Sequence, residues 1–260
     1  MNAGLMKFEK SRLFLEEIGA LSRFTSRFFQ ALFTRPFEGK ELLRQCYQMG
    51  NRSILLVAVT GFILGLVLTL QTRPTLIEFG AVSWMPNMVS VSIVRELGPM
   101  ITALICAGKI ASGIGAELGS MRVTEQIDAM EVSGTNPFKY LVVTRILATT
   151  ITLPLLILIG DAIALYGSAL VEFYKGQVSF ALYFNRAFNS LEFPDLIPAT
   201  VKSLFFGFAI GLVGCFKGYN SSKGTAGVGL AANSAVVFTS MLLFFIDFIA
   251  VFITDIYYAN

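Results

Sequence analysis

The sequence predicts an all-α integral membrane protein with five transmembrane helices. Hydrophobic residues make up 55% of its 260 residues and charged residues only 14%, and the mean hydropathy is +0.69. A soluble domain of this length could not bury so much apolar surface. The apolar residues also gather into five long runs, each able to cross about 30 Å of hydrocarbon as a helix, and the charged residues lie mainly between these runs.

Residues 1–53 are predicted to form an amino-terminal interfacial region that precedes the five-helix domain of residues 54–260. This region begins with charge and has no continuous apolar stretch, which argues against a cleavable signal peptide. Apolar residues recur at helical spacing between basic ones, as in a helix that lies in the headgroup layer; packing of this stripe on the rest of the chain is the alternative. The stripe is Phe14, Ile18, Leu21, Phe28 and Leu32, with Arg23, Arg27 and Arg35 among the polar positions. Pro36 and Gly39 are expected to end this helix, and a second short helix over residues 41–50 to lead into the membrane.

The predicted spans are residues 54–70, 88–107, 146–170, 196–216 and 236–253. After the first span comes an outer connection, in which Arg73 and Pro74 make continuation of the helix unfavourable. In the second span, Gly98 and Pro99 predict a kink, because proline removes a helical hydrogen bond. Two GxxxG pairs would let helices approach closely, either within the chain or between two copies. These pairs are Gly61 with Gly65 and Gly207 with Gly211.

The basic residues are distributed unevenly between the two sides of the membrane. Of twenty Lys and Arg residues, the amino-terminal region holds nine, the segment 109–145 four, and the Gly/Ser-rich loop 217–229 two. The opposite side holds three, in the connection 71–86 and in the segment 171–194, which is expected to carry a small surface helix. Because cytoplasmic segments are enriched in basic residues, the amino terminus and the segment 109–145 are predicted to be cytoplasmic and the carboxyl terminus periplasmic.

A polar hairpin lies within the segment 109–145, between the second and third spans. Thr124 is expected to cap a short helix there, and Gly134 with Pro137 to end it. Ile127 and Met130 share one face of that helix. The charged residues around it are Glu117, Arg122, Glu125, Asp128 and Glu131. The pattern favours a helix that a soluble partner could grip; a plain solvated loop is the alternative.

Five ionisable residues fall inside or at the edge of the spans: Arg95, Glu96, Asp161, Lys202 and Asp247. Each costs roughly 2.5 to 3.5 kcal/mol at the centre of a membrane helix. Lys202 lies near the outer end of its span at a depth similar to Arg95 and Glu96, whereas Asp161 and Asp247 are expected to lie deeper. Either these groups pair with one another to hold the bundle together, or Arg95 and Lys202 bind a phosphate while Glu96 orients Lys202.

The composition excludes several kinds of chemistry. The chain has no histidine, which removes zinc hydrolases and Ser-His triads, and no metal site is expected. Its cysteines, Cys46, Cys106 and Cys215, are scattered and predict no disulfide. The stretch AGKIAS is not a phosphate loop, because GxxxxGK[ST] would need glycine at 103 and Ser or Thr at 110, where the chain has Ala103 and Ile110. If ATP drives this protein, another chain must bind it.

The segment 95–155 resembles the permease subunit of the MlaE family, the bacterial phospholipid ABC transporters. The resemblance rests on three runs: RELGP at 95–99, AELGSMRVTEQIDA at 116–129 and PFKYLVVTR at 137–145. It is thinner over residues 41–252. Lys109 departs from the family, which usually has an arginine there, and a lysine cannot make the bidentate contact of an arginine.

The resemblance implies a transport function with several partners. The chain would act as a homodimer with two copies of a cytoplasmic ABC ATPase, which binds the ATP, with an MCE-domain lipid-binding protein on the periplasmic side and with a small cytoplasmic accessory subunit. It would be no enzyme itself. It would move phospholipid between the inner membrane and a periplasmic carrier, and so help maintain the lipid asymmetry of the outer membrane.

The resemblance also implies two sets of site residues. The hairpin helix would be a coupling helix that docks in the ATPase, so the five charged residues around it would be ATPase-coupling residues. Phospholipid would lie in an outward-facing cavity near the dimer axis. The implied headgroup residues are Arg95, Glu96, Leu97 and Lys202, and the implied acyl-chain residues are Leu68, Leu76 and Phe79.

Two other classes of protein compete with this interpretation. A secondary transporter coupled to ions through Asp161, Asp247 and Glu96 would explain the buried acids but not the charged hairpin, and the sequence shows no paired halves. A structural anchor that recruits partners to the membrane would leave the charges inside the spans unexplained.

Overall fold

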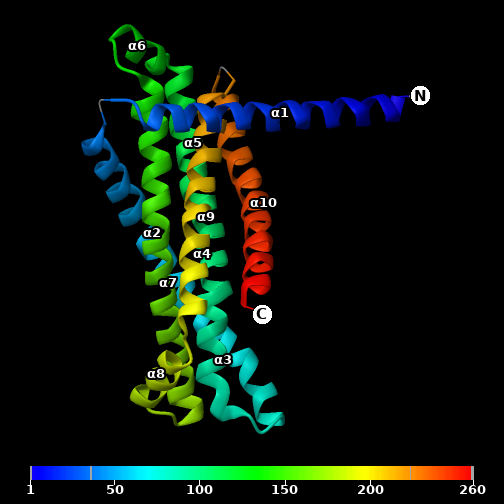
Figure 1. Ribbon diagram of the computed structural model, residues 1–260, viewed down its shortest axis with the longest axis vertical. Helices are drawn as coiled ribbons and strands as arrows, with labels where there is room; N and C mark the ends of the chain where they lie inside the picture. The colour runs from blue at the N-terminus through cyan, green and yellow to red at the C-terminus, as the bar shows by residue number, and fades with distance from the viewer. Residues whose placement is uncertain (1, 36, 223, 259–260) are drawn as a thin grey trace.

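All of the secondary structure that the described residues form is helical, in agreement with the predicted fold class (Figure 1). The computed structural model describes residues 2–35, 37–222 and 224–258, with side chains for residues 15–257 of these ranges. Phe14 of the predicted stripe and Pro36 lie outside the described side chains. The helices up to the hairpin are α1 Asn2–Leu32, α2 Gly39–Glu78, η1 Val82–Trp84, α3 Met85–Ser92, η2 Ile93–Leu97, α4 Gly98–Cys106, η3 Ala107–Ala111, α5 Ser112–Val123 and α6 Gln126–Val132. Those after it are η4 Phe138–Val143, α7 Thr144–Gly176, α8 Phe180–Asn189, α9 Phe193–Tyr219 and α10 Thr225–Tyr258.

Five helical stretches in the described ranges are long and apolar enough to cross a membrane, which agrees with the number predicted. They are Gly39–Glu78, Val82–Val123, Phe138–Gly176, Phe193–Tyr219 and Thr225–Tyr257. Each is longer than the apolar run that predicted it. At 1.5 Å per residue, the 40-residue first stretch is about 60 Å long, roughly twice the thickness of the hydrocarbon core. The helices therefore continue beyond the apolar runs into the polar connections.

The helix α2 corrects two boundary predictions. The short helix expected over residues 41–50 is not separate, and the helix does not stop at Pro74, which lies inside α2. Tertiary contacts explain the continuation. The Arg73 guanidinium pairs with the fully buried Glu172 of α7, Nη1 to Oε1 at 2.5 Å, and Nη2 donates to the Lys175 carbonyl at 3.0 Å. These contacts hold the last turns of α2 against α7 despite the lost proline hydrogen bond.

The second transmembrane stretch is irregular near Gly98 and Pro99, as predicted. The chain forms one wide π-helical turn over Ile93–Leu97 and another over Ala107–Ala111. Pro99 lies in the first turn of α4, where a missing N–H is tolerated. The π turn places Arg95 and Glu96 at the point where the helix changes its winding, a kind of position at which functional residues are frequent.

The GxxxG pairs pack within the chain, which settles a question that the sequence leaves open. A Cβ added at Gly61 would lie 2.6 Å from the Gly160 carbonyl oxygen of α7, and one at Gly65 only 1.8 Å from that of Ala164. Gly207 of α9 lies equally close to the backbone of α7 at Thr149. The glycines thus let α2 and α9 pack closely on α7.

The helix α1 runs across the bundle rather than along it, and its amino-terminal part extends away from the other helices (Figure 1). Its carboxyl-terminal half packs on the rest of the chain, where Phe24 and Phe28 are buried. The centroid of the Phe24 ring lies 5.1 Å from that of Phe138 and 5.5 Å from that of Phe216. Ile18, further towards the free end, is half exposed. Packing on the chain therefore accounts for part of the predicted stripe.

The bundle has two distinct ends (Figure 1). The hairpin end carries α6 and α1. The α8 end, at the opposite side, carries α8 and the turn before α3. The helix α8 is the small surface helix predicted within 171–194, and it is fixed by a buried hydrogen bond from the Tyr183 hydroxyl to Ser168 Oγ at 2.6 Å. Thr69 of α2 donates to the same Ser168 oxygen at 2.6 Å, so this end joins three helices.

Candidate functional site

The ammonium group of Lys202 is buried where three helices meet. The residue is only 4% exposed. Its Nζ lies 2.9 Å from Glu96 Oε2 and 2.9 Å from Asp247 Oδ1, and it donates to the Arg95 carbonyl oxygen at 3.3 Å. The Lys202 ammonium and the Asp247 carboxylate are close enough for an ion pair, but the angles between them do not meet the geometry of a hydrogen bond. One lysine on α9 thus connects the π turn η2 with α10.

The pairing of Lys202 with Glu96 agrees with the prediction, but the expected greater depth of Asp247 is wrong. Asp247 contacts the same ammonium group as Glu96, so both carboxylates lie at one level. The depth was mispredicted because residue counts along separate spans ignore helix tilt and the extra residue that each π turn inserts. The available signal was the isolation of Asp247 in an otherwise apolar span, which calls for a buried partner.

The Arg95 side chain has a partner outside this cluster. It is 51% exposed, and its Nη1 lies 3.9 Å from Asp195 Oδ1, at the limit of an ion pair. Only its backbone carbonyl meets Lys202. Arg95 and Glu96 thus have different partners, as expected for neighbours on a helix, and the Arg95 guanidinium remains the more available cation near the cluster.

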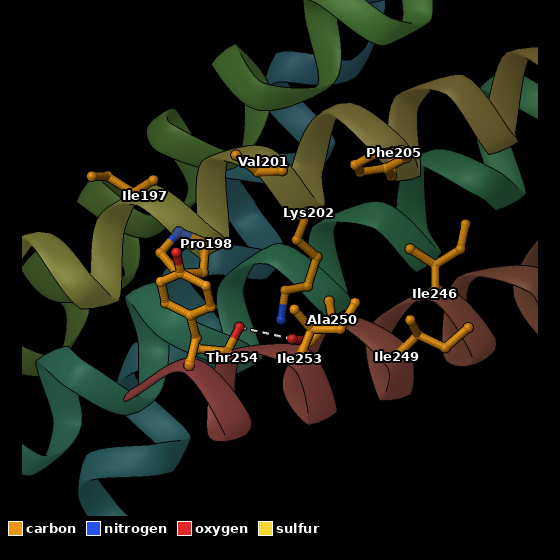
Figure 2. A pocket seen from close by; sticks show the side chains of 11 residues that line it. Ile197, Pro198, Val201, Lys202, Phe205, Ile246, Ile249, Ala250, Ile253 and Thr254 are labelled. Carbon is orange, nitrogen blue, oxygen red and sulfur yellow. Dashed lines mark hydrogen bonds between the residues drawn. The ribbon is translucent and has the colours of Figure 1, made fainter. Parts of the chain in front are cut away.

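An apolar groove between α9 and α10 adjoins Lys202 (Figure 2). It encloses about 430 Å³. Val201 and Phe205 line it from α9, and Ile246 and Ile249 from α10, with the Lys202 side chain pointing between the two helices. A smaller polar cavity, which includes Arg95 and Glu96 in its lining, lies beside it. The arrangement places a buried ion-pair cluster, with one lysine between two carboxylates, against a long apolar surface.

The other predicted lipid residues lie elsewhere in this chain. Leu76 is buried and Leu68 partly buried in an apolar cluster around Val89 near the α8 end, Phe79 is 79% exposed, and Leu97 is half-buried. None of the four lines the groove. Within one chain, the structure therefore brings together Lys202, Glu96 and Asp247, with the Arg95 backbone, but not the predicted acyl-chain residues.

Asp161 stands apart from the cluster. It is buried on α7 against Gly98, where an added Cβ would lie 1.7 Å from Asp161 Oδ1. That oxygen has no hydrogen-bond partner among the described residues. Asp161 thus packs on the start of α4 and does not take part in the Lys202 ion pairs.

The hairpin helix α6 forms where predicted, but its cap differs. Thr124 Oγ1 donates to the Ser120 carbonyl at 2.9 Å and so belongs to the end of α5. The residue before α6 is Glu125, which adopts the left-handed conformation with φ of 59°. This tight reversal between α5 and α6 leaves no extended residue to serve as a Ser/Thr cap. Gly134, with φ of 79°, follows the end of α6 as expected.

The predicted coupling residues fall into two groups. Arg122 and Asp128 pair across the hairpin at 2.7 Å, and Glu117 pairs with the buried Arg145 at 2.8 Å. Glu125 and Glu131 are exposed and make no ion pair with another described residue. Ile127 is fully buried and Met130 partly buried against the core, so the hairpin is a fixed part of the bundle. Val132 on the same helix is 91% exposed.

Comparison with known proteins agrees with these features. Residues 42–253 match the family Permease MlaE. The chain is 38% identical to a probable ABC transporter permease protein of Rickettsia felis over 94% of its own length and 93% of the relative. It is 32% identical to a probable ABC transporter permease protein of Synechocystis, over 90% and 89%. It is also 32% identical to the intermembrane phospholipid transport system permease protein MlaE of Haemophilus influenzae, over 88% and 90%. With this match over most of its length, the chain belongs to the MlaE permease family of ABC transporter membrane subunits.

Proposed function

We propose that this permease moves phospholipid between the bacterial inner membrane and a periplasmic lipid carrier, and so helps maintain the lipid asymmetry of the outer membrane. The observation that carries the proposal is the half-exposed Arg95 and the Lys202 ion-pair cluster beside the apolar groove between α9 and α10. An amphiphile would place its charged headgroup at the charged residues and its apolar chains in the groove. The name of the Haemophilus relative supports the choice of phospholipid.

In this proposal the two cations have different roles. Arg95 is half exposed and only loosely paired, so its guanidinium is the group available to a lipid phosphate. Lys202 is held by Glu96 and Asp247 and fixes the shape of the cluster. Leu97 would lie near the headgroup, and Leu68, Leu76 and Phe79 would meet acyl chains only where a second copy of the chain completes the cavity.

The proposed assembly is a homodimer with two cytoplasmic ABC ATPases, which bind the ATP, an MCE-domain periplasmic lipid-binding protein and a small cytoplasmic accessory subunit. The amino terminus and the hairpin end face the cytoplasm, and the carboxyl terminus faces the periplasm, because most basic residues belong to the hairpin end. Closure of the ATPases would push on α6. Since Ile127 and Met130 tie α6 to the core, the push would reach the flanking spans and narrow the lipid cavity.

The headgroup assignment is tested by replacing Arg95 with glutamine. The purified complex should lose most of its bound phospholipid, roughly a tenfold loss of affinity or more for one charge-assisted contact, while its melting temperature changes little. Arg186→Gln is the matched control, because Arg186 is another cation at the α8 end and lies outside the groove. Bound phospholipid equal to wild type in Arg95→Gln would remove Arg95 as a ligand.

The coupling assignment is tested by reversing charge at Glu125 and Glu131. Neither makes an ion pair with another described residue, so Glu125→Lys with Glu131→Lys should leave insertion intact. We expect it to reduce the amount of ATPase that co-purifies, because like charges would oppose the docking surface. Co-purification of the ATPase and transport equal to wild type would mean that α6 is not a coupling helix.

The alternative, an ion-coupled secondary transporter, receives less support from the geometry. It needs Asp161, Asp247 and Glu96 to form one pathway, whereas Glu96 and Asp247 share the Lys202 ammonium and Asp161 packs separately on Gly98. Transport by the purified complex that follows a proton gradient without ATP would favour this alternative.

A further inference from the structure

A second, polar cavity of about 320 Å³ lies towards the hairpin end, between α2 and the segment of η3 and α5. It shares no lining residue with the groove at Lys202. Its polar lining includes Gln48, Arg52 and Ser53 of α2, together with Lys109 and Glu117. Apart from Glu117, none of these polar residues belongs to the coupling residues around α6 or to the Lys202 cluster.

Two cations of the cavity lie where the apolar surface of the protein ends. Arg52 comes two residues before the first apolar run, which starts at Ile54, and Lys109 comes two residues after the second run, which ends at Ala107. Both therefore lie at the boundary between hydrocarbon and headgroups. The Lys109 ammonium donates to the Arg52 carbonyl oxygen, which joins the two helices and leaves two of its three N–H groups for another acceptor.

The cavity has excess positive charge. Its one lining carboxylate, Glu117, is neutralised by the buried Arg145 at 2.8 Å. The Arg52 guanidinium is exposed and forms no ion pair with any carboxylate of the described residues. Arg52 and Lys109 are thus two positive charges without a compensating acid in the cavity, and an anionic ligand would supply the compensation.

A buried hydroxyl in the cavity also lacks a partner. Ser53 is 1% exposed, and its Oγ makes no hydrogen bond with any described group. Buried hydroxyls in native proteins are nearly always paired, and one without a partner is destabilising. A phosphate oxygen held between Arg52 and Lys109 would accept the Ser53 hydrogen and complete the site.

We propose that this cavity binds the phosphate of a phospholipid of the leaflet at the hairpin end. Leu56 and Val59 lie four and seven residues after Arg52, on the same face of α2, and both are exposed, so acyl chains of a lipid held at Arg52 would lie along them. The site is separate from the groove at Lys202. The inference requires only that the chain spans a membrane, and it does not depend on the direction or substrate of transport.

The test follows the reactivity of a cysteine placed at the cavity. Gln48 is half-buried in the lining, so the purified complex would carry Gln48→Cys with Cys46→Ser, which removes the partly accessible native thiol. The remaining cysteines, Cys106 and Cys215, are buried. The rate of alkylation by a water-soluble maleimide is measured against increasing dihexanoyl phosphatidylglycerol, dihexanoylglycerol and inorganic phosphate.

We expect phosphatidylglycerol to slow alkylation and dihexanoylglycerol, which has no phosphate, to have no effect. Adding Arg52→Gln should raise the concentration that protects by roughly ten- to a hundredfold, because one charge-assisted contact is lost. Arg44→Gln is the control, since Arg44 is an exposed arginine on the same helix outside the cavity. Arg52→Lys, which keeps the charge, should retain part of the protection.

Three results would overturn the proposal. Equal protection by dihexanoylglycerol would mean a purely apolar site, and equal protection in Arg52→Gln would remove the cationic site. Protection by inorganic phosphate at the same concentration as phosphatidylglycerol would assign the site to free phosphate instead of lipid. The same titration in an Arg95→Gln background is expected to be unchanged, so failure of the proposed transport function would leave this test intact.

Discussion

At the scale of single residues, Lys202 shows how one buried charge can organise a membrane bundle. Its ammonium faces carboxylates from η2 and α10, so removing it would leave both without a counter-ion, and the Asp247 side chain is only 17% exposed. A buried ion pair adds little net stability compared with an apolar packing, but breaking it from one side is costly. Removal of Lys202 together with its two carboxylate partners therefore distinguishes a structural lysine from a ligand.

Lys202→Met should lower the free energy of unfolding by about 3 kcal/mol or more, because two carboxylates are left unpaired. The triple variant Lys202→Met, Glu96→Gln and Asp247→Asn removes all three charges and should recover most of that loss. Thermal unfolding of the purified complex measures the stability, and co-purified phospholipid is the second readout. If the triple variant also recovers wild-type lipid, Lys202 has no part in binding it.

The backbone conformation of Glu125 leads to a second prediction at the scale of single residues. Its left-handed backbone costs a non-glycine residue roughly 1–2 kcal/mol. Glu125→Gly should therefore stabilise the hairpin, whereas the β-branched Glu125→Val should destabilise it. Hydrogen exchange of the α6 amides reports the local stability. Slower exchange in the valine variant than in the glycine variant would contradict the observed turn.

At the scale of elements, the number and type of the spans could be predicted but their ends could not. An apolar run must be long enough to cross the hydrocarbon core, so these runs locate each span. The helices nevertheless continue past the runs where polar side chains find partners. Pro74 shows the limit: the local rule ends the helix, and the Arg73–Glu172 pair, made across ninety-nine positions of sequence, overrides it. The Lys202 cluster shows the same limit. The contact between Lys202 and Glu96 was predicted, whereas the level of Asp247 depends on how α10 packs against α9.

The close approach of α2 and α7 gives a prediction at this scale. Gly65→Ala would force a Cβ to within 1.8 Å of the Ala164 carbonyl oxygen, so the two helices must separate. We expect a marked drop in melting temperature and in the yield of folded protein. Gly229→Ala is the control, because no atom lies within 4 Å of the added carbon. A melting temperature for Gly65→Ala equal to that of the control would mean that the helices do not pack as described.

At the scale of the whole molecule, the two ends differ in charge and in the kind of contact that they offer. The hairpin end has most of the basic residues, the exposed Val132 and the polar cavity at Arg52. The α8 end is closed by buried hydrogen bonds around Ser168. We expect this asymmetry in charge to set the orientation of the chain in the membrane.

The orientation can be measured with reporters fused to the two termini. An enzyme that is active only in the periplasm should be active at the carboxyl terminus and inactive at the amino terminus, because the basic residues concentrate at the hairpin end. A cytoplasmic reporter serves as the reciprocal control. Equal activity at both termini would mean an even number of crossings and would remove the five-span topology.

The position of α1 has a consequence for how the protein adapts to membranes of different thickness. Since α1 lies across the bundle and Phe24 and Phe28 fix it to the core, we expect it to hold the hairpin end at a constant depth relative to one bilayer surface. A thinner or thicker bilayer then changes the immersion of the opposite end alone. Hydrophobic mismatch costs a fraction of a kcal/mol per ångström. We expect that cost to fall on the helix ends around α8, so lipid chain length would alter their exposure and leave the height of α6 above the membrane constant.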